Sequence, residues 1–135
     1  VLAHELGHVL GIGTLWTRGA AGAPGAVQAA GGWRHLGART RRVGAWWGRE
    51  LADAMGGVPL GDAWAPGRGH WSEDAFGTEL MTPMIGTGPS PLSLLSVEAL
   101  GDLGFYVVSA AGAEGFGRFG GVGPLANRLG VAGAA

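Results

Sequence analysis

The chain has 135 residues, which is enough for one small domain. Its 9 basic and 10 acidic side chains give a net charge of −1, which excludes the concentrated positive charge that nucleic-acid binding requires. The sequence contains no cysteine, so disulfides and cysteine-based zinc sites are excluded and any bound metal needs His, Asp or Glu ligands. No run of apolar residues approaches the length of a transmembrane span.

The first predicted element is a helix over residues 1–12. On a helix, His4 and His8 fall within about 40° of each other and therefore project from one side. Three apolar side chains fall on the opposite side: Leu2, Leu6 and Val9. We expect that apolar side to face the core, and Gly11 and Gly13 to end the helix. Because a helix of this kind normally follows shielding strands, we also expect an N-terminal part of the domain to precede it.

The middle of the chain alternates between glycine-rich stretches and one further helix. Residues 13–37 and 56–77 are rich in Gly and predict irregular structure. Residues 38–55 predict a helix, because large apolar residues recur there at spacings of mostly three and four. These residues are Val43, Trp46, Trp47, Leu51 and Met55.

The last predicted helix covers residues 93–103 and follows a compact apolar turn over 78–86. Ser93 or Ser96 can act as its N-cap, and Gly104 lies just beyond its end. The sequence therefore predicts a turn followed by a short capped helix.

The end of the chain changes in composition. Residues 105–108 form a short apolar run that predicts a strand. From residue 110 onward the chain is mostly Ala and Gly, which is typical of a tail or linker. We therefore predict one partial domain over 1–109 and a tail over 110–135.

The clearest motif is His4-Glu5-Leu6-Gly7-His8, which is H-E-x-x-H. Two His residues four positions apart on a helix can direct their ring nitrogens at a single zinc ion, and the Glu between them projects near the same place. Zinc brings the pKa of a water molecule close to 7, so Glu5 can take its proton as the water attacks a carbonyl. Two His ligands are too few, so a third protein ligand is expected.

Several residues can supply the third ligand. The compact metzincin signature places it at position 14, which is Thr here. His35 and His70 remain, and Glu50 is a further candidate because another group of zinc proteases uses a Glu on a second helix. His70 lies shortly before Glu79-Leu80-Met81-Thr82-Pro83, a segment similar to the Met-turn under the metal of metzincins.

Three segments together resemble the leishmanolysin family of zinc proteases. They are H-E-L-G-H-V-L-G-I-G-T-L-W, G-H-W-x-E-x-x-F-G-x-E-L-M-T and P-L-S-x-x-S-V-E-A-L-x-D-L-G-F, and the resemblance spans residues 1–108. In that family the third His follows a long insertion and precedes the Met-turn, a position that His70 fits. Met81 fits the Met-turn itself. The absence of cysteine indicates a bacterial-type relative, and the Met-turn is not followed by a nearby Tyr.

The resemblance implies an α+β metzincin-like zincin fold, represented by the active-site helix and the loop-rich C-terminal subdomain, with the N-terminal sheet missing from this sequence. It implies one Zn²⁺ held by His4, His8 and His70, with Glu5 as general base and Met81 beneath the metal. It further implies a metalloendopeptidase that acts on protein or peptide substrates and is secreted or attached to the cell surface.

Two other functions stay open at this stage. The chain could be a catalytically inactive binding or adhesion module stabilised by the metal, or a glycine-rich scaffold with an accidental motif. Glu73 and Glu79 are candidates for holding an imidazole in one tautomer, or for being exposed carboxylates. For the Trp residues at 33, 46, 47, 64 and 71, core packing is favoured over lining a substrate cleft.

Overall fold

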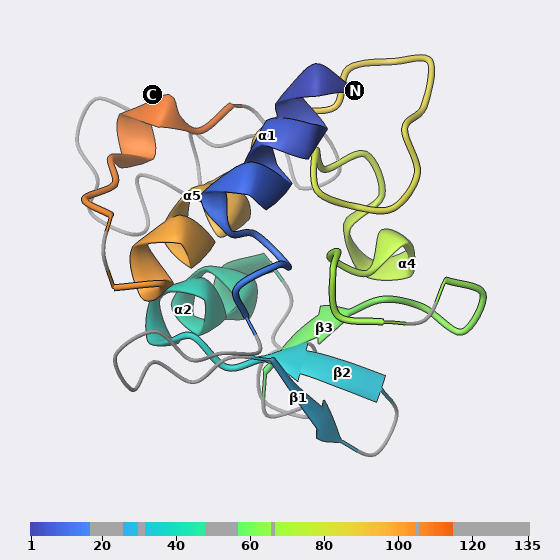
Figure 1. The fold of residues 1–135 in the computed structure, drawn as a ribbon, viewed down its shortest axis with the longest axis horizontal. Coiled ribbons are helices and arrows are strands. Elements are labelled where there is room, and N and C mark those ends of the chain that lie inside the picture. Colours follow the sequence, from blue (N-terminus) through green and yellow to red (C-terminus); the bar gives the residue numbers. More distant parts are fainter. Residues whose placement is uncertain (17–25, 30–31, 48–56, 66, 105, 115–135) are drawn as a thin grey trace.

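The computed structural model describes residues 1–16, 26–29, 32–47, 57–65, 67–104 and 106–114. A small antiparallel sheet lies at one end of the molecule, and helices α1, α2 and α5 are stacked beyond it (Figure 1). Within the described residues, no helix combines the length and apolarity needed to cross a membrane.

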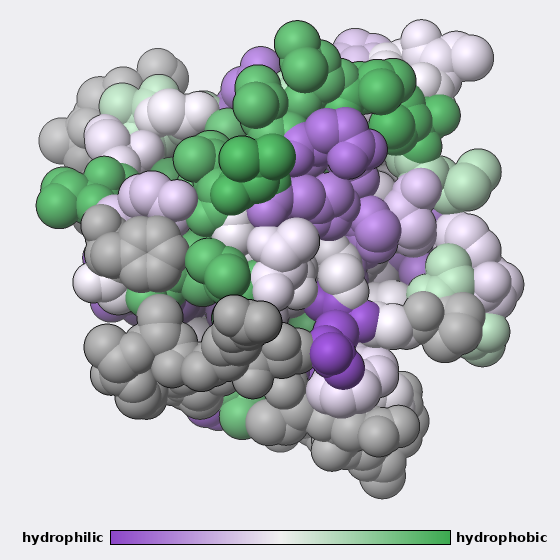
Figure 2. Space-filling model, in the orientation of Figure 1, coloured by the Kyte–Doolittle hydropathy of each residue, from purple (hydrophilic) through white to green (hydrophobic). Residues whose placement is uncertain are grey.

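Helix α1 (Leu2–Leu10) turns its histidine side inward. His4 and Gly7 are buried, whereas three apolar side chains are 50–79% exposed: Leu2, Leu6 and Val9. Figure 2 shows this apolar surface over α1, beside a hydrophilic patch. The expectation that the apolar side faces the core is therefore wrong for the described residues. The inward side is chosen because Gly7, which has no side chain, lets Met81 pack directly against the helix.

The end of α1 follows the prediction. Gly11 is its C-cap, with φ of 120°, a backbone conformation that residues with a side chain rarely adopt. The amide of Gly11 donates to the carbonyl oxygens of Gly7 and His8.

Three strands form the sheet in the order β1 (Ala26–Ala29), β2 (Gly32–His35) and β3 (Val58–Leu60). Both pairings are antiparallel, with Gln28 opposite Trp33 and Trp33 opposite Leu60. The sequence predicted irregular structure here, and that prediction is wrong for these strands. Their length of three or four residues is too short for an alternating apolar pattern to stand out among the glycines.

Helices α2 (Ala38–Trp47) and α5 (Leu94–Asp102) pack against each other. The carboxylate of Asp102 accepts hydrogen bonds from the backbone N–H groups of Arg39 and Thr40, at distances of 3.0 and 2.8 Å. Asp102 thus caps the first turn of α2 from a different helix. The predicted second helix is confirmed up to residue 47, and its remainder lies outside the described residues.

The prediction for α5 is confirmed, with Ser93 as its N-cap residue. The strand predicted over 105–108 is wrong for 106–108, which form no strand. Val107 is fully exposed, and the hydroxyl of Tyr106 donates to the carbonyl of Leu10. This segment is therefore held by a side-chain hydrogen bond and not by pairing with another strand.

The first residues of the predicted tail pack on the domain. The short 3₁₀ helix η2 (Ala110–Gly112) lies against α5, and Ala110 contacts the core. The amide of Glu114 donates to the carbonyl of Leu92 at 2.7 Å. Residues 115–135 lie outside the described part of the chain.

The core is centred on aromatic side chains. Trp71 is completely buried, and its ring lies 4.7 Å from that of Trp16 and 6.3 Å from that of Phe76. The indole N–H of Trp71 donates to Ser96 of α5 at 2.8 Å. Trp71 thus confirms the expectation of core packing, whereas Trp64 is 53% exposed.

Candidate metal centre

The structure brings His4, His8 and His70 together, although the last lies far from the others in sequence. His70 stands in the segment between β3 and α4 (Glu73–Phe76). Its carbonyl accepts from the amide of Gly61 at 3.1 Å, which ties His70 to the residue that follows β3. The other end of the segment is held by Asp62, whose carboxylate accepts from the backbone N–H of Glu73 at 2.7 Å.

The three imidazoles meet through their Nε2 atoms. The Nε2 atom of His8 lies 3.1 Å from that of His4 and 3.1 Å from that of His70, and the remaining pair is 3.2 Å apart. Nitrogen ligands at 2.0–2.1 Å from a tetrahedral zinc ion are about 3.3 Å from one another. The spacing in this site is therefore close to that of three ligands around one zinc ion.

Backbone carbonyls set the tautomers of the two helical imidazoles. The Nδ1 atom of His4 lies 2.7 Å from the carbonyl oxygen of Leu80, and that of His8 lies 2.9 Å from the carbonyl oxygen of Ile12. A carbonyl can only accept, so each Nδ1 carries the proton and each neutral ring has its lone pair on Nε2. Two lone pairs facing each other at 3.1 Å repel unless a cation lies between them, so the donor set fits a metal ion.

A proton on His70 would also place a positive charge between the rings, but protonation of His70 is unfavourable. Burial, together with the neighbouring His8 and His4, lowers the pKa of His70 to about 4. His70 is therefore neutral near pH 7 and available as a ligand. His4 is buried while His8 and His70 are half-buried, so the cluster is open to solvent on one side.

Glu5 lies beside this open side of the cluster. Its carboxylate is exposed, and it is close enough to His70 to oppose the lowering of that pKa. A carboxylate accessible to solvent and near three converging imidazoles is placed to take a proton from a water molecule at the cluster.

Met81 lies beneath the helix that carries His4 and His8. Residues 79–82 form a tight turn, closed by a hydrogen bond from the amide of Thr82 to the carbonyl of Glu79 at 3.2 Å. Met81 is completely buried, and its thioether occupies the space that a side chain at Gly7 would need. The turn therefore places an apolar side chain against α1 at Gly7, which lies between His4 and His8 in the sequence.

The other candidate ligands lie elsewhere. His35 is buried at 4.7 Å from the ring of Trp16, and its Nδ1 atom accepts from the amide of Gly37. Glu50 lies outside the described residues. Thr14, at the third-ligand position of the compact signature, donates to the carbonyl of His8.

The two carboxylates considered as imidazole partners have different roles. Glu73 accepts from the amide of Met84 at 3.2 Å. Glu79 is completely buried and accepts from the hydroxyls of Ser93 and Ser96, not from an imidazole. Neither carboxylate therefore holds an imidazole tautomer by direct contact, and Glu79 is not the exposed carboxylate that was the alternative. The carbonyls of Leu80 and Ile12 hold the tautomers instead, and the sequence carries no signal for a backbone carbonyl.

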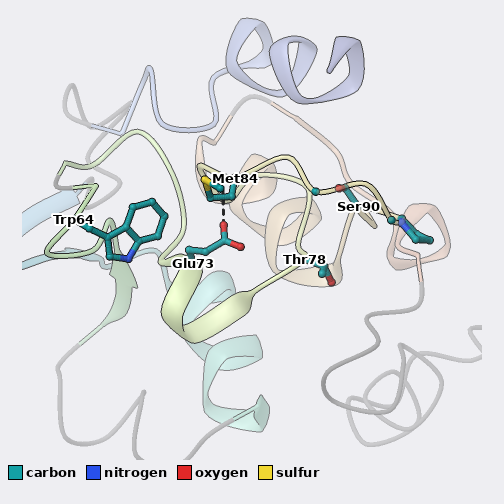
Figure 3. Close-up of a pocket in the computed structure, with 8 residues that line it drawn as sticks. Trp64, Glu73, Thr78, Met84 and Ser90 are labelled. Carbon is teal, nitrogen blue, oxygen red and sulfur yellow. Dashed lines mark hydrogen bonds between the residues drawn. The ribbon is translucent and has the colours of Figure 1, made fainter.

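A pocket of about 590 Å³ adjoins the same segments. Glu73 is three residues after His70, and Met84 is three residues after Met81. Figure 3 shows the carboxylate of Glu73 directed at the backbone of Met84, with Trp64 to one side. Among the described residues, the pocket is lined by Trp64, Glu73, Thr78, Met84, Gly86, Gly88, Pro89 and Ser90.

Comparison of the chain with protein-family models, curated proteins and solved structures gave no match. The resemblance to the leishmanolysin family therefore depends on the motifs in the sequence.

Proposed function

We propose that this chain holds one Zn²⁺ ion through His4, His8 and His70 and hydrolyses peptide bonds with Glu5 as general base. The proposal is carried by one observation, the convergence of three Nε2 atoms at 3.1–3.2 Å while carbonyls occupy the Nδ1 atoms of His4 and His8. Imidazole is a common zinc ligand, and three protein ligands with one open side are typical of catalytic zinc sites.

A bound zinc ion supplies Lewis acidity, which polarises a substrate carbonyl and makes water acidic near neutral pH. The carboxylate of Glu5 accepts a proton from water as the water oxygen bonds to the carbonyl carbon. The same carboxyl group then gives that proton to the leaving nitrogen as the carbon–nitrogen bond breaks. One carboxylate thus serves both proton transfers, and its exposed position lets water and substrate reach it.

The pocket formed by Trp64 and residues that follow His70 in the chain can receive a substrate side chain. Trp64 and Met84 are more than half exposed and give it apolar walls, and Glu73 adds a carboxylate. A polypeptide lying across the open side of the histidine cluster could place a large apolar side chain there. This supports a protein or peptide substrate.

The test compares the chain with its Glu5→Gln variant. Glutamine keeps the size of the side chain but cannot take the proton, so we expect bound zinc to stay at one ion per chain while cleavage of a fluorogenic peptide library falls by 10²-fold or more. Zinc is measured by mass spectrometry of the dialysed protein. Glu114→Gln, an exposed carboxylate on a different segment, is the control and keeps both properties.

The outcomes separate the alternatives. Zinc binding without any cleavage by the unaltered chain indicates a metal-stabilised binding module. Cleavage that survives Glu5→Gln removes Glu5 from the reaction, and absence of zinc removes the metal centre.

A further inference from the structure

Glu79 is a completely buried carboxyl group in the turn that carries Met81. Its Oε2 atom accepts from the amide of Met81 at 2.5 Å, and its Oε1 atom accepts from the amide of Ser93 at 3.2 Å. The hydroxyls of Ser93 and Ser96 donate to the same Oε1 atom, at 2.8 and 2.5 Å. Burial raises the pKa of Glu79, and the hydrogen bonds from Ser96, Met81 and Ser93 oppose that rise. Each oxygen thus accepts one backbone N–H, which can only donate.

These contacts fix the residues that touch the candidate ligands. Leu80, between Glu79 and Met81, supplies the carbonyl that receives the Nδ1 proton of His4. The amide of Trp71, the residue after His70, donates to the carbonyl of Met81 at 3.1 Å. The turn 79–82 is therefore in contact with one ligand and with the backbone next to another.

A second connection runs through Ser96. Its hydroxyl donates to Glu79 and accepts from the indole N–H of Trp71 at 2.8 Å. Glu79 therefore reaches the segment of His70 by two routes, through the backbone of Met81 and through the side chain of Ser96. Because Ser93 begins α5, the same carboxyl group also holds the turn against that helix.

We propose that Glu79 is a positioning residue, which sets the tautomer and orientation of His4 and the placement of His70 through the turn 79–82. This inference rests on the proposed metal centre, and it assigns a function to a carboxyl group that cannot itself reach the metal ligands. Groups that orient metal ligands typically change metal affinity 10- to 100-fold when altered.

The experiment uses Glu79→Gln in the 135-residue chain. Glutamine has nearly the same shape, but one of its two terminal atoms is a donor, so one of the amides of Met81 and Ser93 loses its acceptor whichever way the group turns. We expect the zinc dissociation constant, measured by competition with a chelator, to rise about 10-fold. In the zinc-free protein, ¹⁵N spectra of His4 are expected to change from one tautomer, with the proton on Nδ1, to a mixture.

Glu114→Gln is the matched control, because Glu114 also accepts one backbone amide, that of Leu92 beside the start of α5. It leaves the zinc dissociation constant and the His4 tautomer unchanged. Ser96→Ala is a milder second variant, which removes one donor to Glu79, and it shifts both readouts in the same direction by a smaller factor. It carries the test if circular dichroism shows that Glu79→Gln does not fold.

The two readouts distinguish two failures. If the unaltered chain binds zinc, and Glu79→Gln and Ser96→Ala both bind it equally well with an unchanged His4 tautomer, the positioning role is refuted. If the unaltered chain binds no zinc but the tautomer still changes in the variants, the positioning of His4 is supported and the metal centre is refuted.

Discussion

Replacing Gly13 with Ala tests how closely the end of α1 and the His70 segment must approach each other. Gly13 has φ of 75°, and a methyl group added there would fall 2.7 Å from the carbonyl carbon and 2.8 Å from the Cα atom of Gly69. Gly69 immediately precedes His70. These neighbours are backbone atoms, so a change of rotamer cannot relieve the overlap.

The magnitude follows from those distances. Carbon atoms pack at about 3.5–4.0 Å, so Gly13→Ala must separate the two segments by about 1 Å. The positive φ costs about 1–3 kcal/mol for a residue with a side chain, and overpacking adds about 1–3 kcal/mol. A functional site tolerates displacements of about 0.5 Å, so we expect zinc affinity to fall about 10-fold or more.

Gly104→Ala is the matched control. Gly104 also has a positive φ, of 88°, but a methyl group there meets no atom within 4 Å. Urea unfolding of the zinc-free protein and chelator competition are measured for both variants. We expect both to lose stability, Gly13→Ala by more, and only Gly13→Ala to lose zinc affinity. Equal zinc affinity in the two variants would refute the close approach as a determinant of the site.

Three further predictions concern His70 in the proposed metal centre and two residues outside it, His35 and Asp102. His70→Ala lowers the zinc content measured by mass spectrometry to near zero while His35→Gln leaves it unchanged, and the opposite result would reassign the third ligand. Burial lowers the pKa of His35 to about 4, so between about pH 6.5 and 4 the unfolded chain binds a proton that the folded chain does not. The free energy of unfolding of the zinc-free protein therefore decreases as the pH falls through that window, and His35 accounts for on the order of 3 kcal/mol of the decrease. In urea titrations, the His35→Gln variant lacks that part of the decrease. Asp102→Ala leaves two amides in the first turn of α2 without their acceptor and lowers stability by about 1–2 kcal/mol, with no change in zinc affinity; an unchanged urea midpoint would contradict the capping role.

The elements with a strong local pattern could be predicted from the sequence. The H-E-x-x-H motif and the glycines after it predict a helix that stops near Gly11, and Gly11 is the C-cap of α1. The predicted third helix corresponds to α5, because an N-cap residue and a following glycine mark its two ends. The grouping of His70 with the first two histidines was suggested by resemblance and is present in the structure.

The elements that depend on tertiary contacts could not be predicted from the sequence. The strands β1 to β3 are stabilised by pairing between segments that are individually too short and too rich in small residues to show a period. The inward side of α1 does not follow from the sequence either, because the pattern of Leu2, Leu6 and Val9 predicts an apolar contact but does not identify the segment that makes it. Burial of Glu79 likewise depends on hydroxyl donors from α5, which no local pattern reveals.

The central claim is that three imidazoles bind one metal ion, and X-ray absorption at the zinc edge tests it most directly. For the chain loaded with one equivalent of zinc, we predict three imidazole nitrogens at about 2.0–2.1 Å and one oxygen ligand. In the His70→Ala variant, any zinc that remains should show two imidazoles. A spectrum with fewer than three imidazoles in the unaltered chain, or the same spectrum in the variant, would contradict the account.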